Sequence, residues 1–269
     1  LSDAAESVVN LVAAIVALVA LKVAAKPADK NHHFGHSKAE YFSSAIEGVM
    51  IFVAAAAILV FGIQRLLNPQ PLEQVGIGLL ISIVAAALNG AVAVVLIRVG
   101  RRYNSITLRA DGQHLMTDLV TSIGVVVGVG LVWLTGWEIL DPIVAIAVGI
   151  NILWTGWKLV SESTSGLMDE SLPKETNARL REILASKTSD QVTFHALRTR
   201  VSGARAFMEM HMLVPGAWTV KEGHDSMEDL IDEIRDEFPD LHVTGHLEPI
   251  EDPRSYALVS TGGAALLLY

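Results

Sequence analysis

Five apolar stretches, each close to the length of a helix that crosses a bilayer, fill residues 1–165 of this 269-residue chain. A hydrocarbon core of about 30 Å needs about 20 helical residues. The stretches are residues 4–25, 44–67, 75–99, 114–134 and 142–160. Buried helices of a large soluble core are the alternative, but five such runs leave little polar surface to face water. The pattern therefore predicts a polytopic α-helical membrane protein.

The composition narrows the range of partners. Hydrophobic residues make up 51% of the chain and charged residues only 18%, which is too apolar for one ordinary soluble domain. A formal net charge of −9 argues against nucleic acid and favours cations. The chain has no cysteine, so disulfides and thiolate metal ligands are excluded. Any metal bound here must therefore use His, Asp or Glu side chains.

Basic residues in the short loops predict the orientation in the membrane. The loop before residue 44 holds Lys26, Lys30 and Lys38, and the loop before residue 114 holds Arg98, Arg101, Arg102 and Arg109. Both loops are expected to be cytoplasmic. Five spans that end in the cytoplasm must begin outside, and the first stretch lacks the features of a signal peptide. We therefore expect one further helix upstream and six spans in the intact protein.

From residue 166 the composition changes to that of a small soluble domain. Turn signals and hydrophobic periodicity predict the order helix, strand, strand, helix, strand (αββαβ), an α+β layer. The elements are expected at residues 172–186, 192–201, 206–214, 219–238 and 241–247. The predicted organisation is a transmembrane domain over residues 1–165, a cytoplasmic domain over 166–250 and a disordered tail over 251–269.

Two pairs of polar side chains interrupt the apolar stretches. Glu6 and Asn10 are four residues apart and share one helix face, as do His114 and Asp118. Ionisable groups in hydrocarbon usually mark an ion pathway. Two facing pairs would surround a divalent cation with four donors, and the carboxylates would offset its charge. A position at the membrane interface is the alternative explanation for these pairs.

Further donors lie outside the apolar stretches. Asp29, His32 and His36 are close together in a cytoplasmic loop, a spacing that favours chelation, although a solvated polar loop is the alternative. The soluble domain holds five more donors, and surface imidazoles without a function are the alternative there. These donors are His195, His211, His224, His246 and Glu248. The i, i+2 spacing of the last two predicts that they share one sheet face.

Three motifs carry a resemblance to a known family. They are residues 31–40 (NHHFGHSKAE), residues 109–118 (RADGQHLMTD) and residues 195–200 (HALRTR). Together they resemble the cation diffusion facilitator family, close to its bacterial zinc and iron exporters, and the likeness extends from Glu6 to Pro249. The resemblance implies a homodimer of six-helix subunits in the lipid bilayer of the bacterial inner membrane. It also implies cytoplasmic metallochaperone-like domains and exchange of a divalent cation for protons.

The resemblance also implies roles for individual residues. Matched to the motifs, Glu6, Asn10, His114 and Asp118 form the transport site, and Asp29, His32 and His36 form a loop site. A binuclear site in the soluble domain would be made by His195, His211, His224, His246 and Glu248. Lys38 and Asp169 match a charge interlock between subunits.

The chain departs from the family pattern at Glu6 and Asn10, where two aspartates are common. Asp3, one turn earlier, is an alternative donor to Asn10. An amide in place of a carboxylate removes one negative charge, which leaves Fe²⁺, Mn²⁺, Co²⁺ and Cd²⁺ as alternatives to Zn²⁺.

The sequence thus predicts a proton-coupled exporter of a divalent metal, with Zn²⁺ as the first candidate and also as a regulatory ligand of the soluble domain. A metal-gated channel or a metal sensor is the alternative, but a four-donor site holds an ion too tightly for fast conduction. An enzyme is not expected, because the chain shows no nucleophile-base pair or phosphate loop. Glu47, in the second apolar stretch, is either an interfacial acid or a candidate for a proton path.

Overall fold

A computed structural model describes residues 2–68 and 77–256 of the chain. The side chains of residues 2–9 and 77–82 are not part of that description. The chain divides into two compact units after Leu167.

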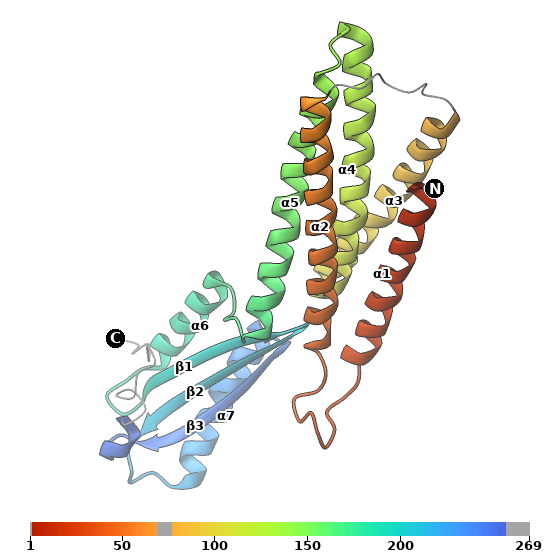
Figure 1. Ribbon diagram of the computed structural model, residues 1–269. Coiled ribbons are helices and arrows are strands. Elements are labelled where there is room, and N and C mark those ends of the chain that lie inside the picture. Colours follow the sequence, from red (N-terminus) through yellow and green to blue (C-terminus); the bar gives the residue numbers. More distant parts are fainter. Residues whose placement is uncertain (1, 69–76, 257–269) are drawn as a thin grey trace. The chain divides into compact units, whose positions relative to one another are not determined.

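In the described residues of the first unit, five helices lie at the positions of the five apolar stretches. They are α1 (Ser2–Ala24), α2 (Ala39–Leu67), α3 (Ile77–Arg102), α4 (Ile106–Thr135) and α5 (Leu140–Leu167) (Figure 1). Among the described residues, α2 to α5 are long and apolar enough to cross a membrane. The described apolar part of α1, Asn10–Ala24, is shorter than that criterion requires. The predicted helical membrane fold is confirmed, while the start expected at residue 75 lies outside the described residues.

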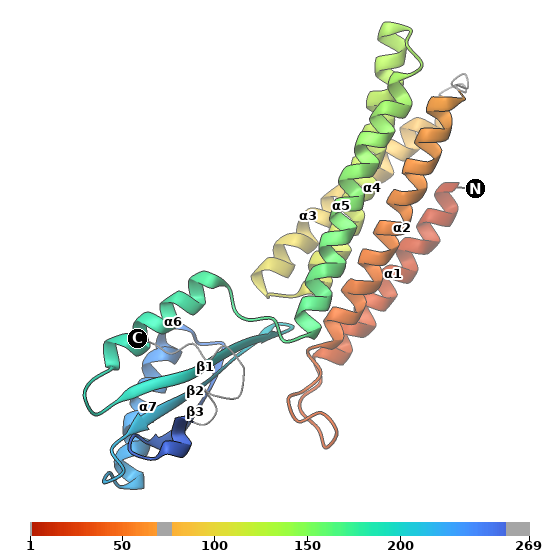
Figure 2. The same cartoon turned by 60° about the vertical axis from the view of Figure 1, so that its left-hand side comes forward.

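The helices of this unit pack side by side along much of their length. In both views α2 lies along α5 (Figures 1 and 2), and α4 contacts α2, α3 and α5. A glycine allows α2 and α5 to approach closely: a Cβ added at Gly156 of α5 would lie 2.8 Å from the backbone nitrogen of Phe52 in α2. Small residues at such crossings let helix backbones meet in a membrane.

Helix α4 begins eight residues before the expected start of its apolar stretch. Ser105 is the N-cap, and its hydroxyl accepts a hydrogen bond from the backbone N–H of Leu108. Hydropathy identifies only the part of a helix that is suited to hydrocarbon. A helix whose N-cap lies in the polar region begins before that apolar part. His114 therefore lies about two turns inside α4 rather than at its end.

The second unit has the predicted αββαβ order. Its elements are α6 (Lys174–Lys187), β1 (Thr193–Ser202), β2 (Arg205–Val214), α7 (Val220–Glu237), β3 (Leu241–Pro249) and a short 3-10 helix, η1 (Pro253–Tyr256). The sheet order is β1-β2-β3, with β1 antiparallel and β3 parallel to β2. Helix α7 has a capping box at its N-terminus, formed by Thr219 and Glu222.

One face of this sheet is covered by both helices. Met208, Met210 and Met212 alternate along β2 and are buried with Leu184 of α6 and Ile234 of α7. The intervening residues of β2 point to the opposite face because side chains alternate along a strand. The histidines of the strands lie on that opposite face.

The predicted disordered tail is wrong for its first part. Residues 253–256 form η1, which is held by hydrogen bonds from the Ser255 hydroxyl to the Pro249 carbonyl and from the Ser255 N–H to the Asp252 carbonyl. The Arg254 guanidinium beside Asp252 lowers the pKa of that carboxyl to about 2. The amino-acid composition of residues 251–269 gives no indication of these local hydrogen bonds. The rest of the predicted tail, residues 257–269, lies outside the described residues.

Candidate metal sites

Three predicted donors of the transport site meet in the first unit. Asn10 of α1 lies between His114 and Asp118 of α4: its Nδ2 donates to Asp118 Oδ2 at 3.1 Å, and its Oδ1 lies 2.9 Å from His114 Nε2. His114 is 7% exposed. The predicted i, i+4 pair of α4 thus faces the predicted residue of α1. The side chains of Glu6 and Asp3 are outside the description, so their part in this site stays a prediction.

The Asn10 amide bridges the two side chains of α4. Its NH₂ group donates to the Asp118 carboxyl group, and its carbonyl oxygen faces His114 Nε2. His114 Nδ1 is buried and makes no hydrogen bond with the described residues. The three side chains offer an amide oxygen, an imidazole and a carboxylate, which is a donor set suited to a divalent transition metal.

A buried glutamate that sequence reasoning missed holds the start of α4. Glu40 of α2 is 5% exposed, and its Oε2 accepts hydrogen bonds from the Ser105 hydroxyl and, at 3.3 Å, from the Thr107 N–H. In return the Thr107 hydroxyl donates to the Glu40 carbonyl at 3.2 Å. A carboxylate at a helix N-terminus satisfies free N–H groups and is favoured by the helix dipole. These hydrogen bonds join the start of α4, the helix that carries His114, to the first turn of α2.

The three donors predicted in that loop also form a cluster. Asp29 Oδ1 lies 3.3 Å from His32 Nδ1, and Asp29 Oδ2 lies 3.4 Å from His36 Nε2. The two imidazole rings are 4.3 Å apart, and one ligand atom from each of the three residues fits within 4.8 Å. The backbone N–H groups of Asn31 and His32 donate to Asp29 Oδ1 at 2.8 and 2.7 Å. These two bonds hold the pKa of Asp29 below its usual range.

The depressed pKa of Asp29 leads to a testable pH dependence. A carboxyl with a lowered pKa in the folded protein keeps its charge, and the contribution of that charge, until the pH falls through the lowered value. Asp29 should therefore remain ionised at pH 5, so protonation of Asp29 should not contribute to any loss of metal between pH 7 and pH 5. We expect Asp29→Asn to weaken Zn²⁺ binding by about tenfold or more at both pH values.

The measurement is a Zn²⁺ titration of the full chain at both pH values, in a background where His114→Ala and Glu248→Ala remove the other two clusters. His33→Ala, an exposed imidazole of the same loop, is the control. A pH dependence that becomes steeper or flatter in Asp29→Asn would mean that Asp29 itself titrates in this range.

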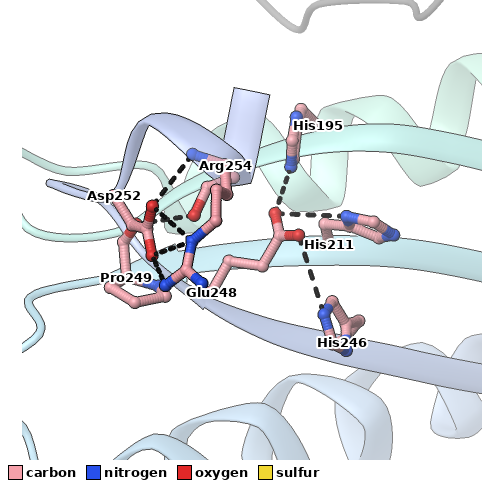
Figure 3. A network of polar contacts seen from close by, with 8 residues as sticks. His195, His211, His246, Glu248, Pro249, Asp252 and Arg254 are labelled. Atoms are coloured by element: carbon pink, nitrogen blue, oxygen red, sulfur yellow. Dashed lines mark hydrogen bonds and ion pairs between the residues drawn. The ribbon is translucent and has the colours of Figure 1, made fainter. Parts of the chain in front are cut away.

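The third cluster lies on the open face of the sheet in the second unit. Figure 3 shows the carboxylate of Glu248 between three imidazoles, one from each strand. Its Oε2 lies 2.7 Å from His195 Nε2 and 3.2 Å from His211 Nδ1, and its Oε1 lies 3.6 Å from His246 Nε2. The strand register explains the arrangement, because His211 of β2 is paired with His195 of β1 and with His246 of β3. The prediction that His246 and Glu248 share a face agrees with this contact.

These donors suit a metal ion. One ligand atom each from His195, His211 and Glu248 lies within 4.8 Å of the other two, near enough for one metal ion to contact all three residues. His195 is 3% exposed, and its Nδ1 atom makes no hydrogen bond with the described residues. A buried polar atom without a partner is rare in folded proteins and calls for an explanation such as a bound ion. A metal held here would link all three strands.

The structure does not bring His224 to this cluster. His224 is the fifth residue of α7, its side chain is 64% exposed, and its Nδ1 is 4.0 Å from Glu228 of the same helix. Helix α7 packs on the other face of the sheet, which separates His224 from the strand histidines. The five-donor binuclear site implied by the family resemblance is therefore present only as a cluster of His195, His211, His246 and Glu248.

The two residues of the predicted interlock make contacts within their own units. Lys38 Nζ donates to the carbonyl of Leu167 at 3.2 Å, which joins the loop between α1 and α2 to the end of α5. Asp169 pairs with Arg200 of β1 at 3.1 Å. An interlock between subunits stays a prediction.

Two family models match the chain. Residues 1–168 match the cation efflux transmembrane domain, and residues 172–250 match the cytoplasmic domain of cation efflux proteins, a dimerisation domain. The boundary between the two matches falls where the structure divides into its two units.

Several known proteins are similar over nearly the whole chain. The transporter sll1263 of Synechocystis sp. is 53% identical over 95% of this chain and 83% of its own length. The cation-efflux pump FieF of Escherichia coli is 30% identical over 91% of this chain and 81% of its own length. A solved structure of CzrB in its zinc form is 35% identical over 31% of this chain and 96% of that structure, with a TM-score of 0.29.

Proposed function

The chain belongs to the cation efflux family, and from this premise we propose that it exports Zn²⁺ or a similar divalent metal in exchange for protons. Members of this family are membrane transporters rather than enzymes, with a cytoplasmic C-terminal domain. The metal is the transported substrate. The proposal also concerns which ion is transported, how its transport is coupled to protons, and which residues bind it.

The contact of Asn10 with His114 and Asp118 is the observation that carries this proposal. It joins donors from two helices inside an apolar bundle, where polar groups are costly unless they are paired or bind a ligand. Glu6 lies one turn before Asn10 on α1, so it is proposed as the fourth donor. Two carboxylates would then neutralise the charge of a divalent ion.

Proton exchange follows from the chemistry of the same donors. An imidazole must be free of a proton at the nitrogen that binds the metal, and a carboxylate must be ionised. Metal arrival therefore favours proton release, and proton arrival weakens metal binding. If the site opens alternately to the two sides of the membrane, an inward proton gradient drives metal out of the cell.

Further parts of the proposal concern assembly and regulation. We propose a homodimer in the bacterial inner membrane, supported by the match of the second unit to a dimerisation domain. The loop cluster around Asp29 and the sheet cluster around Glu248 are proposed as regulatory metal sites. Lys38 and Asp169 are proposed as the charge interlock between subunits.

Flux measurements in proteoliposomes test the function. With the full chain in vesicles that contain a zinc dye and a pH dye, an imposed proton gradient should drive Zn²⁺ uptake, and a zinc gradient should drive protons in the opposite direction. Zinc flux that is unaffected by the proton gradient would contradict antiport. Flux that saturates only at very high zinc, with no proton movement, would instead indicate a passive pore.

Residue 10 is expected to influence which metal is transported. Asn10→Asp adds a negative charge beside His114 and Asp118 and replaces an amide donor with a carboxylate. We expect it to shift the order of preference among Zn²⁺, Fe²⁺ and Mn²⁺ in competition uptake assays, because ligand type and charge determine selectivity among these ions. Asn89→Asp, an amide of α3, is the matched control. Identical preference profiles for Asn10→Asp and the wild type would mean that residue 10 is not a ligand.

A further inference from the structure

Glu47 of α2 is a buried acid that the proposed metal sites do not use. Its relative exposure is 0%. The Ser43 hydroxyl donates to Glu47 Oε1 at 3.2 Å, while Oε2 is buried and has no hydrogen-bond partner among the described residues. Neighbouring helices therefore enclose the carboxyl group, while the depth of Glu47 in the membrane stays a prediction.

The surroundings of Glu47 offer it no cationic partner in the described part of the chain. Next to it, α2 and α5 approach closely, since a Cβ added at Gly48 would lie 3.0 Å from the backbone nitrogen of Val160. The charged group that acts on Glu47 from α4 is another carboxylate, that of Asp111.

The charged groups of the other neighbouring helices are engaged or exposed. On α5, Glu162 pairs with Arg109 and Lys158. On α1, Lys22 is exposed. A negative charge on Glu47 is therefore opposed by burial and by a second acid, whereas a neutral carboxylic acid fits this environment.

Asp111 connects this acid to the transport site. It lies three residues before His114, on the same side of α4, and its carboxylate interacts electrostatically with the His114 side chain. A divalent ion held by His114 and Asp118 would place positive charge within about one helical turn of Asp111. That charge favours ionisation of the two acids, and its departure favours uptake of a proton by them.

We propose that Glu47 binds one of the exchanged protons, at a position separate from the metal ligands, with Asp111 as the link to the ion. In the metal-free state the proton resides on the Glu47 carboxyl group, whose Oε1 accepts the hydrogen bond from Ser43. When the ion arrives, the O–H bond of the acid breaks and the proton leaves to water. This inference rests on the proposed antiport.

The test uses the full chain in proteoliposomes and compares wild type with Glu47→Gln. The amide has the shape of the neutral acid but binds no proton. We expect Glu47→Gln to bind Zn²⁺ at equilibrium, to move one proton fewer per zinc ion, and to show a flatter dependence of zinc flux on pH. Glu162→Gln, which removes a carboxylate that is already ion-paired on α5, is the matched control and should behave as the wild type.

The outcomes separate this inference from the function on which it rests. If the wild type moves no protons with zinc, antiport itself fails and the role of Glu47 falls with it. If the wild type moves protons and Glu47→Gln has the same stoichiometry and pH profile, the role of Glu47 alone is overturned. Should Glu47→Gln not assemble, proton release on zinc addition to Ser43→Ala in detergent gives the second measurement. Loss of the Ser43 hydrogen bond should change the pH range of that release, and an unchanged range would overturn the proposal.

Discussion

Replacement of His114 with alanine is expected to reduce proton-driven zinc uptake by about 100-fold or more, to the background of empty vesicles. Mutation of groups that only orient a metal ligand already costs about 10- to 100-fold in affinity or activity, and the change here removes a ligand itself. The substitution also leaves Asn10 Oδ1 without its contact to the imidazole, so the bridge between α1 and α4 is lost on one side. Zinc uptake into dye-loaded proteoliposomes measures the effect.

The control must show that the loss is chemical and not a failure to fold. His33→Ala removes an imidazole that belongs to none of the three clusters and should transport at the wild-type rate. His114→Ala should retain the helix content and the detergent-solubilised size of the wild type. Transport by His114→Ala at half the wild-type rate or more would remove this residue from the path of the ion.

Substitution of Glu248 is expected to have the largest effect in the second unit. The Glu248 carboxylate contacts His195, His211 and His246, so Glu248→Ala removes the centre of the cluster. We expect the full chain to lose the metal bound by this cluster, measured as metal per chain after dialysis against Zn²⁺. We also expect a lower unfolding temperature of the second unit in zinc but not in chelator, because a bound metal adds its binding free energy to stability.

A histidine on the same strand provides the control for Glu248. His242 of β3 stacks on Phe207, with ring centroids 5.1 Å apart, and takes no part in the cluster. His242→Ala should keep the metal content of the wild type. Equal metal content in Glu248→Ala and the wild type would show that the cluster does not hold zinc.

Much of the architecture could be predicted because it depends on local periodicity. The i, i+4 spacing of His114 and Asp118 placed them on one face of α4, and the i, i+2 spacing of His246 and Glu248 placed them on one face of β3. Apolar stretches identified the five helices of the first unit. The hairpin between β1 and β2 was marked by Ser202 and Gly203, and Gly203 has a positive φ of 59°.

What the sequence did not reveal depends on contacts between distant residues. Ser105 and Thr107 donate hydrogen bonds to Glu40, which lies more than 60 positions away in the sequence. No periodicity of the sequence indicates such a contact. A bulge where Ala196 adopts a φ of 53° shifts the register of β1 after His195, although alanine gives no sign of a positive φ. The place of His224 depended on which sheet face α7 covers, and a histidine early in a helix does not indicate that face.

Asn10, His114 and Asp118 are proposed to hold the transported ion together. Anomalous scattering at the zinc edge, from the full chain crystallised with Zn²⁺, would locate that ion. We expect a peak in the first unit within about 2.2 Å of a ring nitrogen of His114 and an oxygen of Asp118. Zinc in the first unit that binds elsewhere, with the Asn10 bridge to both residues unchanged, would contradict it.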